Sequence, residues 1–423
     1  MSEYKIRREK TLDLMPEGSI MILHSGVSKI SSESGTYPFE PNRNFYYLTG
    51  ITQEGSVLVL VKGVGEKREY LFIDEYNEVK EKWTGKKITP QEAEIISEIN
   101  NVLTNNVLES KIDLAIQFNS SYFGKIDKVY LDSSIELKVS ENMFISDYKK
   151  NMETLYPHIT FYDLRPILTS LRMKKSPYEI EKIKEAINLT QHGINQILLA
   201  LKSGKKEKSL ANVFEFYGRE KGDTGLAFDT IVASGKNATC LHYPSQNDII
   251  KEGDGLLLDL GYRKDFYCAD ISRTYPVSGE FNEIQKKIYS TVLLCNKAVI
   301  EYAQCGLTLM DLQKFTIEFF KNELTRLGLL KDGEDIHKYY YHGVSHHLGL
   351  DTHDVSDRSL PLEAGNVITI EPGLYFEQYN FGVRIEDDVL ITNEGVEVLS
   401  RSIPKEINEI EKLVKHCRGV RGE

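Results

Sequence analysis

The chain has 423 residues, a net charge of −11, 41% hydrophobic residues and 27% charged residues. This length allows two or three domains, and the composition is that of an ordinary globular protein. The acidic balance argues against nucleic acid or a membrane surface as the main partner, because both need a basic protein surface. The five cysteines form no CxxC pair, and no segment has the character of a signal peptide or a membrane span, so we expect a cytoplasmic location.

Helical and strand patterns alternate in the first part of the chain. Helical spacing over the first 14 residues ends at a turn at 15–18. Period-two or continuous apolar patterns then predict strands, and these lie in SIMIL, TYPFEPNRNFYYLTG, GSVLVLVKG, KREYLFIDE and DKVYLDS. Between the last two, PQEAEIISEINNVL has a helical pattern. This alternation predicts an α/β domain over residues 1–170.

The sequence Ser-Pro-Tyr-Glu at 176–179 is the clearest boundary signal. Serine, proline and glutamate at these positions form a capping box, which predicts a long helix that ends near Leu201. Further helical patterns lie at 207–221 and 281–305. In this second domain, predicted at 171–423, two helices followed by an acid-bearing hairpin occur twice. The pattern therefore favours a domain with two repeated halves.

Four acidic residues interrupt strands that otherwise look buried. Asp259 follows three leucines, and Asp270 lies eleven residues later across a turn, so both could face the same side of a hairpin. Glu371 and Glu386 repeat this arrangement. A carboxylate in an apolar strand is costly to bury unless a positive charge compensates it. Four such acids together predict a shared cation.

Histidines cluster just before the second acidic pair. His342 and His346 are four residues apart, but the glutamate of the HExxH zinc motif is absent between them. A carboxylate-rich set with one imidazole favours two divalent ions, first Mn²⁺, with Fe²⁺, Co²⁺ and Zn²⁺ as alternatives. Two such ions would hold a hydroxide nucleophile near neutral pH and polarise a carbonyl group.

The segments LLLDLG, CADISRTY, HGVSHHLG, TIEPGLY and RIEDD resemble, in this order, the ligand segments of the pita-bread metallopeptidases, a family that includes methionine aminopeptidase, prolidase and aminopeptidase P. The resemblance implies an α+β pita-bread catalytic domain with pseudo-twofold repeated halves. It also implies two metal ions: Asp259 would bind one, His346 and Glu371 would bind the other, and Asp270 and Glu386 would bridge them.

The same resemblance implies catalytic roles for other residues. His242 would contact the scissile peptide, and His353 would stabilise the tetrahedral intermediate. Glu371, besides binding metal, would carry a proton from the nucleophile to the leaving amine. Arg384 resembles the arginine that holds an acidic ligand in place.

Substrate-binding roles are also implied. His342 and Tyr375 resemble residues that line a pocket for the proline ring, and Trp83 resembles a tryptophan that a neighbouring subunit lends to the site. His347 matches no role and is predicted to lie at the surface.

The segments MPEGSIMIL and FYYLTG resemble the N-terminal domain of aminopeptidase P and of some prolidases, although Asn44 stands where the family commonly has aspartate. The resemblance therefore implies a homodimeric or homotetrameric Xaa-Pro aminopeptidase that acts on peptides with proline in second position. Two alternatives stay open: a prolidase restricted to Xaa-Pro dipeptides, and an inactive relative that binds peptides or proteins.

Overall fold

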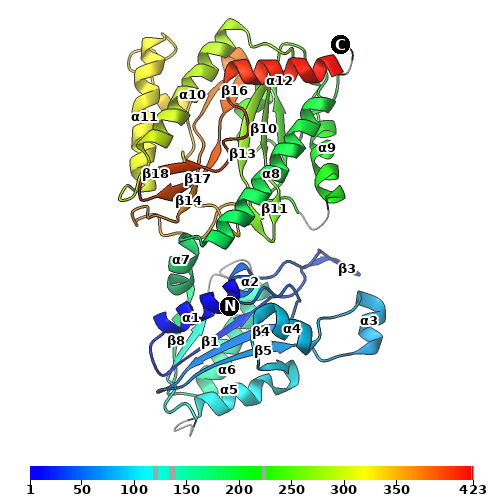
Figure 1. Ribbon diagram of the computed structural model, residues 1–423, viewed down its shortest axis with the longest axis vertical. Coiled ribbons are helices and arrows are strands. Elements are labelled where there is room, and N and C mark those ends of the chain that lie inside the picture. The colour runs from blue at the N-terminus through cyan, green and yellow to red at the C-terminus, as the bar shows by residue number, and fades with distance from the viewer. Residues whose placement is uncertain (118–121, 133–139, 222–224, 421, 423) are drawn as a thin grey trace. The chain divides into compact units, whose positions relative to one another are not determined.

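The computed structural model describes residues 1–117, 122–132, 140–221, 225–420 and 422 (Figure 1). The chain divides into two compact units, Met1–Leu171 and Arg172–Glu423. Among the described residues, no helix combines the length and the apolar character needed to cross a bilayer.

A six-stranded mixed sheet forms the centre of the first unit (Figure 1). In spatial order its strands are β6 (Val102–Thr104), β5 (Lys67–Ile73), β4 (Val57–Lys62), β1 (Ser19–His24), β7 (Lys128–Leu131) and β8 (Thr160–Asp163). The strands β1, β4 and β5 pair antiparallel, whereas β6, β7 and β8 join in parallel. A separate hairpin consists of β2 (Ile30–Ser32) and β3 (Gly35–Thr36).

Seven described helices belong to this part of the chain. They are α1 (Glu3–Leu14), α2 (Arg43–Thr49), α3 (Glu78–Thr84), α4 (Pro90–Ser97), α5 (Leu108–Ile116), α6 (Ser140–Leu155) and α7 (Arg165–Met173), which leads into the second unit. Aliphatic side chains of the central strands form a core with Ile112 and Ile116 of α5 and Met152 of α6. Helices α1 and α2 contact β4 and β1. The α/β character predicted for this part is confirmed.

One segment of the first unit differs from its predicted state. The second half of the aromatic stretch that was expected to be a strand region forms helix α2 (Arg43–Thr49) instead. The Asn42 side chain accepts hydrogen bonds from the N–H groups of Asn44 and Phe45, and Gly50 ends the helix in a left-handed conformation with φ of 71°. The prediction gave weight to the strand preference of aromatic residues. The two capping residues decide the outcome because they satisfy the free ends of the helix.

The helical pattern at 90–103 is confirmed only in its first half. Thr89 and Glu92 form a capping box that starts α4, but the helix stops at Ser97, where Glu98 takes a left-handed conformation. The remainder of the pattern enters strand β6.

The second unit has long helices outside and short strands inside. Helix α8 (Pro177–Ala200) begins at the predicted capping box, in which Ser176 and Glu179 exchange hydrogen bonds with each other's backbone N–H groups. The other helices are α9 (Glu207–Glu220), α10 (Glu283–Tyr302), α11 (Leu309–Arg326) and α12 (Ile407–Val420). In Figure 1, α8 and α9 lie on one side of the strands and α10 and α11 on the other.

Two three-stranded sheets carry the acidic hairpins. The first has the order β13 (Ile271–Pro276), β10 (Gly255–Leu260), β9 (Ile231–Ser234), and the second has the order β14 (Val367–Ile370), β17 (Asp387–Thr392), β18 (Gly395–Val398). A two-stranded ribbon interrupts each hairpin: β11 (Arg263–Lys264) with β12 (Tyr267–Cys268), and β15 (Gly373–Phe376) with β16 (Phe381–Arg384).

The two halves differ in the position of their third strand. In the first half, β9 pairs with β10, so β13 stays at the edge of its sheet. In the second half, β18 pairs with β17, so β17 is central. The two halves therefore share the order of helices, strands and ribbon. They differ in the third strand, which pairs with the first strand of the hairpin in one half and with the second strand in the other.

Candidate metal centre

The strand registers place the four predicted acids at the ribbon ends of the two hairpins. In the first hairpin Asp259 pairs with Ser272, so alternation puts Asp259 and Asp270 on the same face. In the second hairpin Ile370 pairs with Asp387, which sets Glu371 opposite Glu386 at the next position. Gly261 allows the first hairpin to narrow here, because a Cβ at this position would clash with the carbonyl oxygen of Ala269.

His346 completes the cluster from the loop that precedes β14. Its Nε2 lies 3.4 Å from Oδ2 of Asp270 and 3.4 Å from Oε1 of Glu371. Potential ligand atoms of Asp270, His346 and Glu386 all lie within 4.8 Å of one another. The His346 Nδ1 lies 3.1 Å from the carbonyl oxygen of His347, which can only accept a hydrogen bond. Nδ1 therefore carries the proton, and the Nε2 lone pair faces the acids.

Burial makes this cluster electrostatically costly. Asp259, Asp270 and Glu386 are 8%, 5% and 2% exposed. Burial raises the pKa values of Asp270 and Glu386 well above their usual range, and the neighbouring acids, including Asp259 and Glu371, raise them further. Burial also raises the pKa of Glu371, although His346 opposes the shift. Crowded carboxylates whose pKa values are raised in a dry interior fit a site for divalent cations, which would stabilise their ionised forms.

Arg384 supplies part of the missing positive charge and begins a hydrogen-bonded chain. Its Nη2 donates to Oδ2 of Asp259 at 2.6 Å, and its Nη1 donates to the Tyr375 hydroxyl at 3.0 Å. Nδ1 of His342 lies 2.7 Å from the carbonyl oxygen of Gly343 and so carries the proton, which leaves Nε2 to accept from the Tyr375 hydroxyl at 2.9 Å. Burial, together with Arg384, lowers the pKa of His342 to about 3, so this imidazole is neutral.

The two other predicted catalytic histidines lie beside the cluster and are exposed. The His353 ring packs edge-on against the His346 ring, with ring centroids 4.4 Å apart. His242 follows the short helix Gly235–Thr239, and its neighbours Leu241 and Tyr243 pack against the small apolar cluster that contains Tyr375. Burial is the main cause that lowers the pKa values of His342 and His353, and the charge of His242 lowers both further.

Two sequence predictions have different outcomes. His347 was predicted at the surface, and this is wrong: its side chain is 2% exposed, and burial lowers its pKa to about 4. His347 forms an antiparallel β-bridge with Ile368 of β14, so its backbone lies against the second sheet. Trp83 lies on α3 of the first unit with 86% of its surface exposed. Its predicted role in a neighbouring subunit stays a prediction.

Sequence reasoning missed several supporting residues. The Ser272 hydroxyl donates to Oε2 of Glu386 at 2.7 Å, and the Thr369 hydroxyl donates to Oε1 of Glu371 at 3.3 Å. A carboxylate oxygen of Asp388 accepts the backbone N–H of Asp270 at 3.1 Å. The available signal was spacing, since Ser272 and Asp388 each follow an acidic ligand candidate by two residues.

A second buried ionic cluster supports the loop that carries His353. Asp354 is 7% exposed and accepts from Arg172 at 2.5 Å and from Lys175 at 3.0 Å. Its backbone N–H donates to the His347 carbonyl at 2.9 Å. These contacts join the two ends of the turn from His347 to Asp354 and attach it to Arg172 and Lys175, just before α8.

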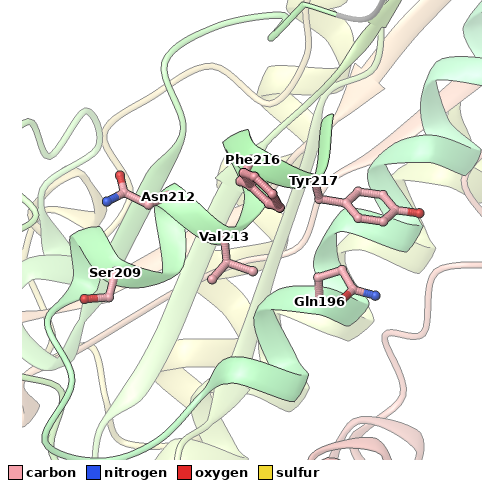
Figure 2. Close-up of a pocket in the computed structure, with 6 residues that line it drawn as sticks. All are labelled: Gln196, Ser209, Asn212, Val213, Phe216 and Tyr217. Atoms are coloured by element: carbon pink, nitrogen blue, oxygen red, sulfur yellow. The ribbon is translucent and has the colours of Figure 1, made fainter. Parts of the chain in front are cut away.

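An open depression between α8 and α9 has a different character. Figure 2 shows its lining side chains, which are Gln196, Ser209, Asn212, Val213, Phe216 and Tyr217. It contains no acid and no histidine, so it offers none of the chemistry of the acidic cluster.

The fold and the cluster of acids define a metal-dependent hydrolase with an additional N-terminal domain. Residues 181–393 match metallopeptidase family M24, and residues 4–122 match the N-terminal domain of aminopeptidase P. The chain belongs to metallopeptidase family M24. The predicted fold class, an α/β N-terminal domain followed by a pita-bread catalytic domain, is confirmed.

Curated relatives and solved structures cover nearly the whole chain. Intermediate cleaving peptidase 55 from mitochondria of Arabidopsis thaliana is 32% identical over 99% of this chain and 84% of its own length. The Xaa-Pro aminopeptidase of Escherichia coli is 30% identical over 98% of both chains. The zinc-substituted structure of E. coli aminopeptidase P in complex with product has a TM-score of 0.89, with 29% identity and 99% coverage of each chain.

Proposed function

We propose that this protein is an Xaa-Pro aminopeptidase, which releases the N-terminal residue of a peptide whose second residue is proline. The observation that supports this most strongly is the convergence of three distant segments on one buried acidic cluster. The E. coli relative named Xaa-Pro aminopeptidase, which matches over 98% of both chains, supports the substrate class.

Asp259, Asp270, His346, Glu371 and Glu386 would hold two divalent ions, for which we propose Mn²⁺ first. Ions bound there would lower the pKa of a water molecule and polarise the scissile carbonyl. The carboxylates of Asp270 and Glu386 would be shared between the ions, which fits the mutual repulsion that raises their pKa values. The orientation of His346 leaves Nε2 free to bind a metal.

Three side chains would handle protons and developing charge. Glu371 lies at the edge of the cluster with its pKa raised by burial, so its carboxyl group is suited to take a proton and pass it to the leaving amine. The exposed ring of His353, held against His346, would donate a hydrogen bond to the oxyanion. His242, in the loop after the short helix Gly235–Thr239, would contact the peptide.

The chain from Arg384 through Tyr375 to His342 would form the wall of the proline site. The amide nitrogen of proline carries no hydrogen, so a peptidase cannot recognise it by an N–H hydrogen bond and must recognise the ring by shape. Tyr375 is 2% exposed and locked by hydrogen bonds on both sides, which gives the wall a fixed position. Arg384 would hold an acidic ligand in place, and its 2.6 Å hydrogen bond to the carboxylate of Asp259 supports this role.

Broader features of the proposal concern assembly and location. We propose that the catalytic domain spans 171–423 and the N-terminal domain 1–170, which the two compact units support. Trp83, exposed on α3, would reach the site of another subunit in a homodimer or homotetramer. In the described part of the chain the five cysteines form no disulfide bonds, which fits a cytoplasmic protein.

One assay tests the proposal. Metal-stripped protein is incubated with an Xaa-Pro-Xaa tripeptide, an Xaa-Pro dipeptide and an Xaa-Ala-Xaa tripeptide, with and without Mn²⁺. We expect release of the first residue from the Xaa-Pro-Xaa peptide only when Mn²⁺ is present, and no turnover of the alanine peptide. Turnover of the dipeptide alone would identify a prolidase instead. Inactivity toward all three, with Mn²⁺ bound, would favour a peptide-binding role.

A further inference from the structure

The two acids proposed to bridge the metals, Asp270 and Glu386, are held by different hydrogen bonds in the two halves of the domain. Each has a buried polar residue two positions after it: Ser272 after Asp270, and Asp388 after Glu386. Each of these residues binds the acid of the other half. The two hairpins are therefore joined by reciprocal contacts next to the cluster.

In the first half, backbone and hydroxyl of Ser272 both act on Glu386. The Ser272 carbonyl accepts the Glu386 N–H at 3.1 Å, and the Ser272 hydroxyl donates to Oε2 of Glu386 at 2.7 Å. The backbone contact is available because β13 is an edge strand, so one of its sides is not occupied by a neighbouring strand.

In the second half the corresponding backbone carbonyl, that of Asp388, faces a neighbouring segment instead. Strand β17 is central, and the Asp388 carbonyl accepts the N–H of Leu399 at 2.9 Å. The N–H of Asp270 is bound instead by Oδ2 of the Asp388 side chain at 3.1 Å. A carboxylate thus takes the place that a backbone carbonyl has in the other half.

Stability alone does not account for an acid at this position. Asp388 is 0% exposed, and among the described residues its Oδ1 has no hydrogen-bond partner. A buried acid with an unsatisfied oxygen is destabilising, so its benefit must lie elsewhere. The side-chain hydrogen bond that Asp388 makes within the described part of the chain ends on the backbone of Asp270, next to the ligand carboxylate.

We propose that Asp388 is a positioning residue, whose side-chain oxygen fixes the backbone of Asp270 so that its carboxylate faces Glu386 at the spacing that two metal ions require. This inference rests on the proposed metal centre. The role belongs to the acceptor oxygen and does not require the negative charge. Partners that orient metal ligands in this way typically change metal affinity 10–100-fold when removed.

The test measures Mn²⁺ binding to metal-stripped full-length protein by isothermal titration calorimetry. Asp388→Asn keeps an acceptor oxygen at the same reach, Asp388→Ala removes it, and Asp388→Ser is polar but too short. Glu394→Ala, at an exposed acid in the turn after β17, is the matched control. We expect Asn and the control to bind within about threefold of wild type, and Ala and Ser to bind about 10–100-fold more weakly.

Circular dichroism and the melting temperature of each metal-free variant show whether it is folded. The inference is overturned if a folded Ala or Ser variant binds Mn²⁺ within threefold of wild type, or if Asn binds more than threefold more weakly. The Asn result decides alone if Ala and Ser do not fold. Absence of Mn²⁺ binding by wild type would instead refute the metal centre, and this inference with it.

Discussion

Replacing Glu386 by glutamine should stabilise the metal-free protein while it removes metal binding. The side chain is 2% exposed, and a carboxylate oxygen of Asp270 lies within 4.8 Å of one of its own. Two ionised carboxylates 4.8 Å apart repel by about 3.5 kcal/mol at an effective dielectric constant near 20. Glutamine has nearly the same shape and can still accept from Ser272, so the variant loses the repulsion but keeps the packing.

The pH dependence of this effect has a definite sign. The pKa values of Asp270 and Glu386 are raised in the folded state, so the folded protein binds protons more tightly than the unfolded chain. Their contribution to stability is complete below the unfolded pKa, near 4, and is lost as pH rises toward the folded pKa. The melting temperature of the metal-free Gln variant should therefore exceed that of wild type by an amount that grows as the pH rises above about 4.

Added Mn²⁺ should reverse the order. At 100 times its dissociation constant, a ligand stabilises the folded state by about 2.7 kcal/mol, which is roughly 5–11 °C for a domain of 150–250 residues. Wild type should show this rise and the Gln variant should not, and peptide turnover should fall more than about 100-fold. Glu394→Gln, an exposed acid, is the control. An unchanged Mn²⁺-dependent rise in the Glu386→Gln variant would refute the ligand assignment.

Three further outcomes test other parts of the site. His353→Ala should lower kcat about 100–1,000-fold with KM and metal content unchanged, and a KM effect alone would contradict an oxyanion role. The folded-state pKa of His347 is lowered to about 4, so wild type loses unfolding free energy as the pH falls below 6.5. The His347→Phe variant should retain up to about 3 kcal/mol of this free energy at pH 4–5. Equal urea midpoints for both proteins at pH 4.5 would exclude this. Asp354→Asn should cost about 3–5 kcal/mol, or roughly 6–20 °C in Tm, because Arg172 and Lys175 lose their buried partner, and a smaller loss would mean that the ionic cluster is not structural.

Much of the candidate site could be read from local sequence because burial of charge is rare. Asp259 inside a run of leucines and Glu371 after an aliphatic strand conflict with their neighbours, and a conflict of this kind indicates function. The capping box at 176–179 was equally local, since its hydrogen bonds join residues three apart. Local signals predicted the start of α8. For α2 two local signals conflicted, the strand preference of its aromatic residues and the capping residues at its ends, and the capping residues prevailed.

The roles of Asp388 and His347 could not be read in the same way. Asp388 binds the N–H of Asp270, 118 residues earlier, and it does so because β17 is central whereas β13 is at an edge. His347 is buried and pairs with Ile368 in a β-bridge, and no periodicity in the sequence indicates either feature. The sequence by itself determined which residues are chemically out of place in a core. Only the tertiary structure decided which of them meet and what holds them, because strand order and register set the contacts between residues far apart in the chain.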